Sequence, residues 1–413
     1  MSKLADISEL LAQAKKGDVT ARLTLADLYE TGMAGDQDIG LAAKWLLLSA
    51  KDGYAEAQSR IGNMFLEGIG VEKDLEKAAY WFQHAANQNY ADAQANLAWC
   101  YQNGLGVKKD FKQAIKWHLK AAKNGHGVAQ YNLGYMYAKG FGTKIDHVEA
   151  LEWYRTAAKQ GNVRAQLNIG LMYAEGCGVS KDDIQAVEWY RKAAEQGYAK
   201  AQYNLALMYA NGSGVPKDNG EAIRWYSQAA EQDYFRAQYN LGLIYLHGEG
   251  VERDYTEALD LFIKAGEKGY HKAQYQVGKI YAKGLGVPED MQDAANWFRY
   301  AADQDYNKAQ LSLGKLYVDG LGVKQDCVTA CRWFSKASRQ GYPMAQYFLG
   351  KMYAKGLGVP KNYVRAYSLI YAAAEANEKK AASSLDKVKN KLNKKELAKA
   401  SRLGKELYLK NRN

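Results

Sequence analysis

Two cysteines in the C-terminal third of the chain have a spacing that could hold a metal ion. Cys327 and Cys331 lie one helical turn apart, but a zinc site needs further ligands and no histidine lies within a turn of them. Cys331 also falls at a position of a recurring pattern that holds Ile115, Leu151 and Val187 elsewhere in the chain. We therefore expect Cys331 to be a core residue, and we assign no metal ligand.

The histidines and the glycine triplets are the other candidates for chemistry. The histidines lie in different sequence contexts, without a partner at catalytic or metal-ligand spacing, so we expect surface residues. They are His84, His118, His126, His147, His247 and His271. Gly284 and Gly286 form one of several G-x-G triplets, yet no strand precedes them and no complete dinucleotide or Walker motif follows. The sequence therefore predicts turns there, no catalytic residue, no cofactor and no enzyme activity.

A glutamine recurs every 36 residues across most of the chain. The series is Gln58, Gln94, Gln130, Gln166, Gln202, Gln238, Gln274, Gln310 and Gln346. A fixed period over this length indicates a solenoid of equivalent units rather than several globular domains. Features particular to this protein must then lie at positions where the repeats differ.

Residues 199–234 represent one repeat. Ala201, Leu205 and Tyr209 recur at helical spacing, and Gly212 and Gly214 then interrupt the pattern. A second helical face follows, made of Ala222, Trp225, Tyr226, Ala229 and Ala230. Each repeat is therefore expected to contain a helix A, a turn and a helix B.

The residues at the helix ends support these boundaries. An aspartate precedes each B helix, where its carboxylate can accept a backbone N–H, so these residues are caps rather than calcium ligands. They are Asp74, Asp110, Asp146, Asp182, Asp218, Asp254, Asp290 and Asp326. Several carry Glu or Gln three residues later, which is the capping-box pattern: Asp146 with Glu149, Asp182 with Gln185, Asp218 with Glu221 and Asp254 with Glu257. After each B helix comes a residue that tolerates a left-handed backbone, namely Gly53, Asn89, Gly125, Gly161, Gly197, Asp233, Gly269, Asp305, Gly341 or Asn377.

The recurring pattern A-x-A-Q-x-x-L-G-x-M-Y-x-x-G-x-G-V-x-x-D-x-x-x-A-x-x-W-Y-x-x-A-A-x-x-G-Y resembles the Sel-one-like repeat, a relative of the tetratricopeptide repeat. The resemblance implies an all-α, right-handed superhelical solenoid with A helices on the concave side and B helices on the convex side. It also implies a non-enzymatic scaffold or adaptor. A secreted branch of the family carries a cysteine pair in each repeat, which this chain lacks, so its ligands are not carried over.

Three regions are expected. Residues 1–18 form an N-terminal capping helix, residues 19–377 form ten repeats, and residues 378–413 form basic C-terminal capping helices. The first repeat is degenerate, with Arg22 in place of the glutamine. The C-terminal region has twelve Lys or Arg and four acidic residues, so it supplies +8 of the formal net charge of +11. It could bind phosphate or a membrane surface, but Leu385, Val388 and Leu392 at helical spacing favour a cap.

A stripe on the A helices, offset from their core positions, is the candidate binding site, because the corresponding stripe of tetratricopeptide proteins is the ligand groove. Aromatic and aliphatic groups with flanking cations suit an acidic or amphipathic protein segment. The candidate groove residues are Trp99, Tyr131, Tyr135, Arg164, Leu171, Lys200, Tyr203, Leu207, Arg236, Tyr239, Leu243, Lys272, Tyr275, Lys279, Lys308, Lys315 and Lys351. Alternatively, the tyrosines pack on the next A helix and the lysines form a solvated face. A neighbouring ladder, Asn96, Asn132, Asn168, Asn204 and Asn240, could bind a peptide backbone, but we favour a structural role.

The location and the partner are open to several interpretations. Residues 1–17 lack the apolar run of a signal peptide or membrane span, and the four cysteines do not recur with the repeat, so we expect a reducing, cytoplasmic location. Secretion by a signal-independent route stays open. A protein or peptide partner is favoured over nucleic acid, because the repeats themselves are nearly neutral. The alternatives are an anionic ligand, nucleic acid or a membrane surface, held by the tail and the groove lysines, or a bacterial effector that engages host proteins.

Overall fold

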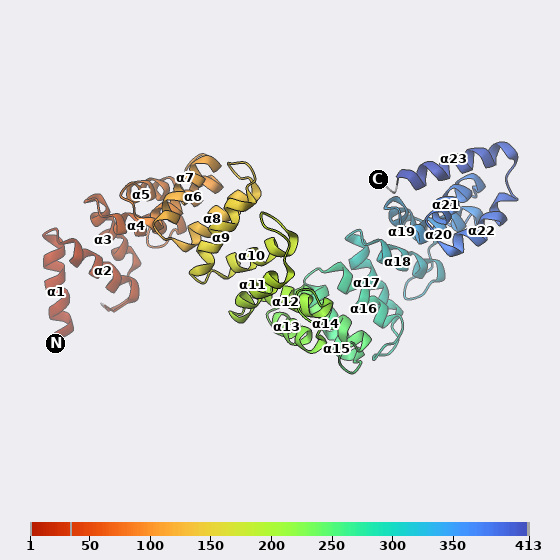
Figure 1. Cartoon of the computed structure of the whole chain (residues 1–413), viewed down its shortest axis with the longest axis horizontal. Helices are drawn as coiled ribbons and strands as arrows, with labels where there is room; N and C mark the ends of the chain where they lie inside the picture. The colour runs from red at the N-terminus through yellow and green to blue at the C-terminus, as the bar shows by residue number, and fades with distance from the viewer. Residues whose placement is uncertain (1, 34, 411–413) are drawn as a thin grey trace. The chain divides into compact units, whose positions relative to one another are not determined.

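The fold is built from helices alone in the part of the chain that the structure describes. The computed structural model describes residues 2–33 and 35–410, which contain 23 helices and no strand. Paired helices follow one another along the chain (Figure 1). The expectation of an all-α solenoid of helix-turn-helix repeats is confirmed.

The helices alternate between the two types that the sequence predicts. The A helices are α2 (Val19–Thr31), α4 (Ala55–Glu67), α6 (Ala91–Asn103), α8 (Gly127–Lys139), α10 (Val163–Glu175), α12 (Ala199–Asn211), α14 (Phe235–His247), α16 (His271–Tyr281), α18 (Asn307–Asp319) and α20 (Pro343–Lys355). The B helices are α3 (Ile39–Lys51), α5 (Leu75–Asn87), α7 (Phe111–Lys123), α9 (His147–Lys159), α11 (Asp183–Glu195), α13 (Asn219–Glu231), α15 (Tyr255–Glu267), α17 (Met291–Asp303), α19 (Cys327–Arg339) and α21 (Tyr363–Glu375). Before them lies α1 (Ser2–Lys15), and after them lie α22 (Lys379–Lys389) and α23 (Lys394–Lys410).

The chain divides into two compact units. The first contains the residues up to Ala201 together with Ser213–Val215, and the second contains Gln202–Gly212 and the residues from Pro216 onwards. Within the units, A helices pack against the B helix of their own repeat and against the B helix before them. Each unit therefore buries its apolar residues between consecutive helices, as a stacked repeat array requires.

Close approach of the A and B helices depends on a small residue in each A helix. A Cβ atom added at Gly134 would come within 2.8 Å of the Tyr154 ring, and one at Gly314 within 2.5 Å of the Phe334 ring. Ala98 and Ala206 are the larger residues at this position, and both are fully buried. The repeat therefore selects glycine or alanine where an aromatic ring of helix B covers the A helix.

The repeating glutamine joins consecutive repeats through two hydrogen bonds. Gln58 donates from Nε2 to the carbonyl of Ala50, at the end of the preceding B helix, over 3.0 Å. Its Oε1 accepts from Nε2 of Gln88, which lies 30 residues later, over 2.8 Å. The same pair of bonds recurs at Gln130 and Gln274. A buried amide satisfied on both sides stabilises the stack, so the glutamine series is structural.

Arg22 replaces the glutamine in the degenerate first repeat and makes equivalent contacts. Its Nε donates to the carbonyl of Ala14 over 3.0 Å, eight residues earlier, as in the glutamine series. Its Nη1 pairs with the carboxylate of Asp52, 30 residues later. The substitution therefore preserves the connection, with α1 in the place of a preceding B helix.

The predicted helix ends are confirmed, but the predicted capping boxes are only half formed. Asp146 accepts from the backbone N–H of Glu149 over 3.0 Å. The return bond is absent because the Asp146 N–H already donates to the carbonyl of Tyr137, and the Glu149 carboxylate accepts from Nε1 of Trp153 instead. All ten residues predicted after the B helices have positive φ, including Asn89 at 61° and Asp233 at 59°.

The C-terminal helices cover the end of the second unit. Ala381 and Val388 of α22 and Ala400 of α23 are buried against α21. Asn393 and Glu396 form a complete capping box at the start of α23, with bonds of 3.0 and 2.9 Å in the two directions. The lysines of α22 and α23 are exposed, while the buried apolar residues of these helices face α21.

Candidate functional site

The predicted groove residues fall at the second, fifth and ninth positions of the A helices, which we call the A-helix stripe. In α16 these positions hold Lys272, Tyr275 and Lys279. The first unit contains the stripe residues from Trp99 to Lys200, and the second contains those from Tyr203 to Lys351. The structure thus brings the predicted residues together on successive helices within each unit.

The tyrosines predicted at the fifth position are half-buried and contribute to packing. The Tyr239 ring lies 5.7 Å from Phe262 of its own B helix and 5.1 Å from Tyr270, which precedes the next A helix. Tyr275 makes the same two contacts, with Phe298 and Tyr306. Burial raises the pKa of the Tyr239 hydroxyl. In the same way Tyr203 contacts Tyr226 and Tyr234, and Tyr131 contacts Tyr154.

The ninth position changes from aromatic to aliphatic to cationic along the chain. In the first unit, Trp99 is 42 % exposed, and half-buried Tyr135 lies 6.0 Å from the Phe141 ring. Leu171, Leu207 and Leu243 are half-buried at the equivalent positions. Because these side chains are not fully enclosed, they retain apolar area that a ligand can cover.

The cations at the ninth position of the second unit lie over aromatic rings. Nζ of Lys279 is 5.9 Å from the ring centre of Tyr275, and Nζ of Lys315 is 4.7 Å from that of Phe348. Lys351 lies 5.4 Å above Tyr347. Burial lowers the pKa of Lys279 and of Lys315, and neighbouring lysines lower both further. None of the three lysines takes part in an ion pair within residues 2–33 and 35–410.

The cations at the second position are exposed. This group comprises Arg164 and Lys200 in the first unit and Arg236, Lys272 and Lys308 in the second. Arg236 lies 5.9 Å from the ring centre of Phe235, and the charge of Lys308 is close enough to lower the pKa of Lys279. In the second unit, the stripe therefore combines exposed cations with partly desolvated ones.

Comparison with known families decides the identity of the repeat. The Sel1 repeat matches ten consecutive segments: residues 21–54, 55–90, 91–126, 127–162, 163–198, 199–234, 235–270, 271–306, 307–342 and 343–378. The chain belongs to the Sel1 repeat family. No curated protein matches it.

Two solved structures of Sel1-type proteins resemble the chain closely. One is c5321, a protective antigen present in uropathogenic Escherichia coli strains that displays an SLR fold. It is 32 % identical with a TM-score of 0.66, over 98 % of this chain and 95 % of that chain. A Sel1 repeat protein from Oxalobacter formigenes is 35 % identical with a TM-score of 0.63, over 75 % of this chain and 90 % of that chain. Sel1 repeat solenoids commonly serve as scaffolds for protein interactions.

The asparagines beside the stripe connect elements of the Sel1 repeats. Asn96 donates to Oδ1 of Asn63 on the preceding A helix over 3.0 Å, and Asn240 donates to the Tyr226 hydroxyl over 3.2 Å. These bonds support the structural role that we favour for the ladder.

The residues considered for metal or acid–base chemistry do not gather into a metal-binding cluster within the described residues. No group of three or more His, Cys, Asp or Glu in the described residues could hold a metal ion. Cys331 is buried, as expected for a core residue, and burial raises the pKa of its thiol to about 11. The expectation of surface histidines is wrong for His118, which is fully buried because it occupies the B-helix position held by Phe82 and Tyr154 in the flanking repeats.

Several cations near the stripe of the second unit were not predicted from the sequence as site residues. Lys380 and Lys387 of α22 continue the second and ninth positions one period after Met344 and Lys351, and Lys380 lowers the pKa of Lys315. The 36-residue register alone could have identified them. Arg253 and Lys283 were also missed, because they lie in turns outside the stripe.

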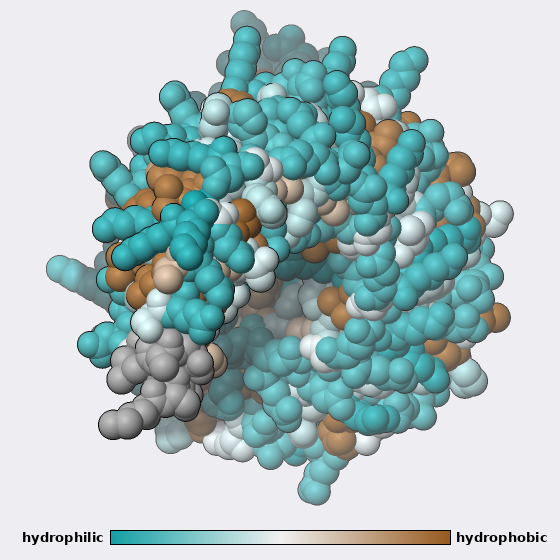
Figure 2. All heavy atoms as spheres, turned by 90° about the vertical axis from the view of Figure 1, so that its left-hand side faces the viewer, coloured by the Kyte–Doolittle hydropathy of each residue, from teal (hydrophilic) through white to brown (hydrophobic). Residues whose placement is uncertain are grey.

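The surface shows no large apolar area from the side drawn in Figure 2, where hydrophobic side chains form small patches among hydrophilic ones. Across residues 2–33 and 35–410, no helix has the length and hydropathy needed to cross a bilayer.

Proposed function

We propose that this Sel1 repeat protein is a non-enzymatic adaptor that binds an acidic or amphipathic segment of a partner protein along its A-helix stripe. The main support is the ninth position of α16, α18 and α20, where three successive lysines are half-buried and form no ion pair within residues 2–33 and 35–410. A carboxylate-bearing segment would supply the missing counter-charges. Because the ions are already partly desolvated, such pairing costs less than it would for fully solvated lysines.

The first unit offers a different type of contact. Trp99 and Tyr135 present aromatic surface at the ninth position, and apolar rings are the groups that most often dominate binding energy at protein interfaces. Leu171 extends this apolar surface on the next A helix. An amphipathic partner can therefore use apolar side chains on the first unit and acidic side chains on the second.

The proposal can be tested with two matched triple variants. The stripe variant changes Trp99, Tyr135 and Leu207 to Ala. The control variant changes Tyr80, Ile184 and Tyr300 to Ala; these B-helix side chains are 55 to 61 % exposed and are divided between the two units in the same proportion. Each tagged protein is used for affinity capture from native lysate, and the proteins recovered are identified and their affinity is measured.

Loss of a specific partner by the stripe variant alone supports the proposal. Removing three interface anchors should weaken binding by at least about 100-fold, which corresponds to about 3 kcal/mol. Equal binding by the two variants, with unchanged circular dichroism, contradicts it.

An anionic polymer is the second candidate ligand, because Lys380 and Lys387 extend the run of cations from the stripe into α22. Nucleic acid binding predicts affinity that falls steeply with salt and survives the stripe variant. Protein binding through apolar anchors predicts a shallower dependence and loss in that variant.

A further inference from the structure

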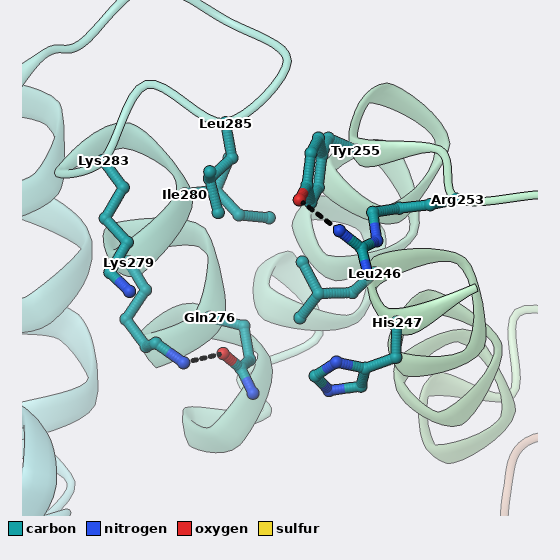
Figure 3. Close-up of a pocket in the computed structure, with 9 residues that line it drawn as sticks. All are labelled: Leu246, His247, Arg253, Tyr255, Gln276, Lys279, Ile280, Lys283 and Leu285. Atoms are coloured by element: carbon teal, nitrogen blue, oxygen red, sulfur yellow. Dashed lines mark hydrogen bonds between the residues drawn. The ribbon is translucent and has the colours of Figure 1, made fainter. Parts of the chain in front are cut away.

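Three cationic side chains line a small pocket in the second unit, and only one of them, Lys279, belongs to the A-helix stripe. The pocket has a volume of about 220 Å³ and lies between the end of α14, the turn before α15 and helix α16. Figure 3 shows Lys279 and Lys283 on one side and Arg253 on the other, with Ile280 and Leu285 between them. The pocket is smaller than the range of about 300–1,000 Å³ typical of cofactor and drug-sized ligands, so it suits a small group.

Two of the three cations, Arg253 and Lys279, are held by neutral partners. Arg253 donates from Nη1 to the hydroxyl of Tyr255 over 3.2 Å, and Lys279 donates from Nζ to Oε1 of Gln276 over 3.1 Å. Lys283 has no ion pair within the described residues, and its charge contributes to the lowered pKa of Lys279. Arg253 and Lys279 are therefore oriented by hydrogen bonds, while the three charges repel one another.

Among the residues that the structure describes, no carboxylate lines the pocket. The nearest acidic residues in the sequence are Glu252 and Asp254, on either side of Arg253. Asp254 is already used as the cap of α15, where its Oδ1 accepts from the backbone N–H groups of Thr256 and Glu257. An anion from outside the chain is thus the group that can relieve the repulsion.

Most other repeats carry different charges at these three positions. One period later the equivalent residues are Glu289, Lys315 and Asp319, so two carboxylates accompany the lysine. Asp319 raises the pKa of Lys315. Lys283, at the equivalent position, lowers the pKa of Lys279. Among the sets at this register, Arg253, Lys279 and Lys283 are all cationic, as are Lys361, Lys387 and Lys391 at the end of the array; only the first set contains an arginine.

We infer that this pocket binds the phosphate group of a phosphorylated side chain on the partner segment, an inference that rests on the adaptor function proposed above. A phosphate monoester carries a charge of about −1.5 to −2 at neutral pH, which matches three cations better than a single carboxylate does. Arg253 can offer two parallel N–H groups to phosphate oxygens, while the lysines act as point charges. The apolar wall of Ile280 and Leu285 can contact the carbon atoms of the same side chain.

The inference is tested with fluorescein-labelled pentapeptides and the full-length protein. The probes are Gly-Gly-phosphoserine-Gly-Gly, its phosphotyrosine counterpart, and the same peptide with glutamate at the centre. Fluorescence polarisation should show that a phosphopeptide binds at least about tenfold more tightly than the glutamate peptide, and inorganic phosphate should displace it. The two phosphopeptides distinguish the chemical source of the phosphate.

The pocket variant copies the acidic residues of the next repeat, as Arg253→Glu with Lys283→Asp. Its charge-matched control is Lys116→Glu with Lys123→Asp, two exposed lysines on α7 in the first unit. Phosphopeptide affinity should fall at least about tenfold in the pocket variant and stay within about twofold of wild type in the control. An equal loss in both variants would mean non-specific charge attraction and would overturn the inference.

The outcome separates this inference from the adaptor function. If no phosphopeptide binds more tightly than the glutamate peptide, the pocket assignment is wrong, whereas partner capture that depends on Trp99, Tyr135 and Leu207 can still hold. If the stripe variant captures partners normally, the adaptor proposal is wrong, even where the pocket binds phosphopeptide.

Discussion

His118 should make the stability of the first unit depend on pH. Its side chain is fully buried, neither ring nitrogen has a hydrogen-bond partner in the described part of the chain, and burial lowers its pKa from 6.5 to about 4. The nearby His126 lowers this pKa further. The folded repeat therefore holds His118 neutral at a pH where the unfolded chain binds a proton.

The direction and size of the effect follow from proton linkage. Because the folded pKa is the lower one, stability is highest above about pH 6.5, falls as the pH drops towards 4, and levels off below that. At about 1.4 kcal/mol for each pH unit between the two values, the total loss is about 3 kcal/mol.

The test variant is His118→Tyr, which restores the residue found at Tyr226. Ala206 and Tyr226 occupy the equivalent positions of another repeat and both are buried, so Ala98 should accept a tyrosine at position 118. Asn132 stands where Asn240 donates to the Tyr226 hydroxyl, and it could donate to the new hydroxyl in the same way. We expect a gain of about 1–3 kcal/mol near pH 8, since two unsatisfied nitrogens are removed, and a difference larger by about 3 kcal/mol near pH 4.

Hydrogen exchange of the α7 amides is the most direct assay, because a repeat array can open locally before it unfolds globally. Urea unfolding between pH 8 and pH 4 gives a second measurement. The control is His84→Gln, a change of an exposed histidine on α5. If wild type and His118→Tyr lose stability equally between pH 6.5 and pH 4, the buried histidine is not the cause and the reasoning fails.

Three further changes test the repeat contacts. Lys268 stands where seven other repeats place Gln or Asn, and Oε1 of Gln238 lacks a donor in the described residues. Lys268→Gln should therefore raise the free energy of unfolding by about 1 kcal/mol, and Lys268→Met should not. Gly314→Ala would bring a Cβ atom within 2.5 Å of the Phe334 ring, so thermal unfolding should show a loss of about 1–3 kcal/mol despite the better helix propensity. Asn393→Ala removes half of the capping box of α23 and should cost about 1 kcal/mol in urea unfolding, with no change in partner binding.

The helices could be predicted from the sequence because each signal recurs in the same register. The aspartate caps and the left-handed residues after the B helices were therefore correct. The capping boxes of the B helices were not, because a bond from the Asp146 N–H to the Tyr137 carbonyl depends on how the turn folds back, which local spacing does not show. The capping box that the sequence indicates at Asn393 and Glu396 is complete. The burial of His118 could have been predicted by aligning it with Phe82 in the preceding repeat.

The candidate site was harder to predict, since it depends on charges from different segments. The stripe follows from helical periodicity, so Lys279 was identified from the sequence. Arg253 lies 26 residues before Lys279, in the turn between α14 and α15, and only the packing of α16 beside that turn brings them to one pocket. The lining of this pocket comes from three segments, so its lack of a carboxylate among the described residues could not be read from any one segment.

The two kinds of stripe position have different consequences for binding and stability. At the fifth position, Tyr239 and Tyr275 each contact two other rings, so removing either loses packing as well as surface. At the ninth position the residue varies from Trp99 through Leu207 to Lys351, while the helices around it keep the same arrangement. A position that tolerates tryptophan, leucine and lysine contributes little to the common fold. Partner selection can therefore change at the ninth position without loss of the solenoid, and substitutions there should separate binding from stability.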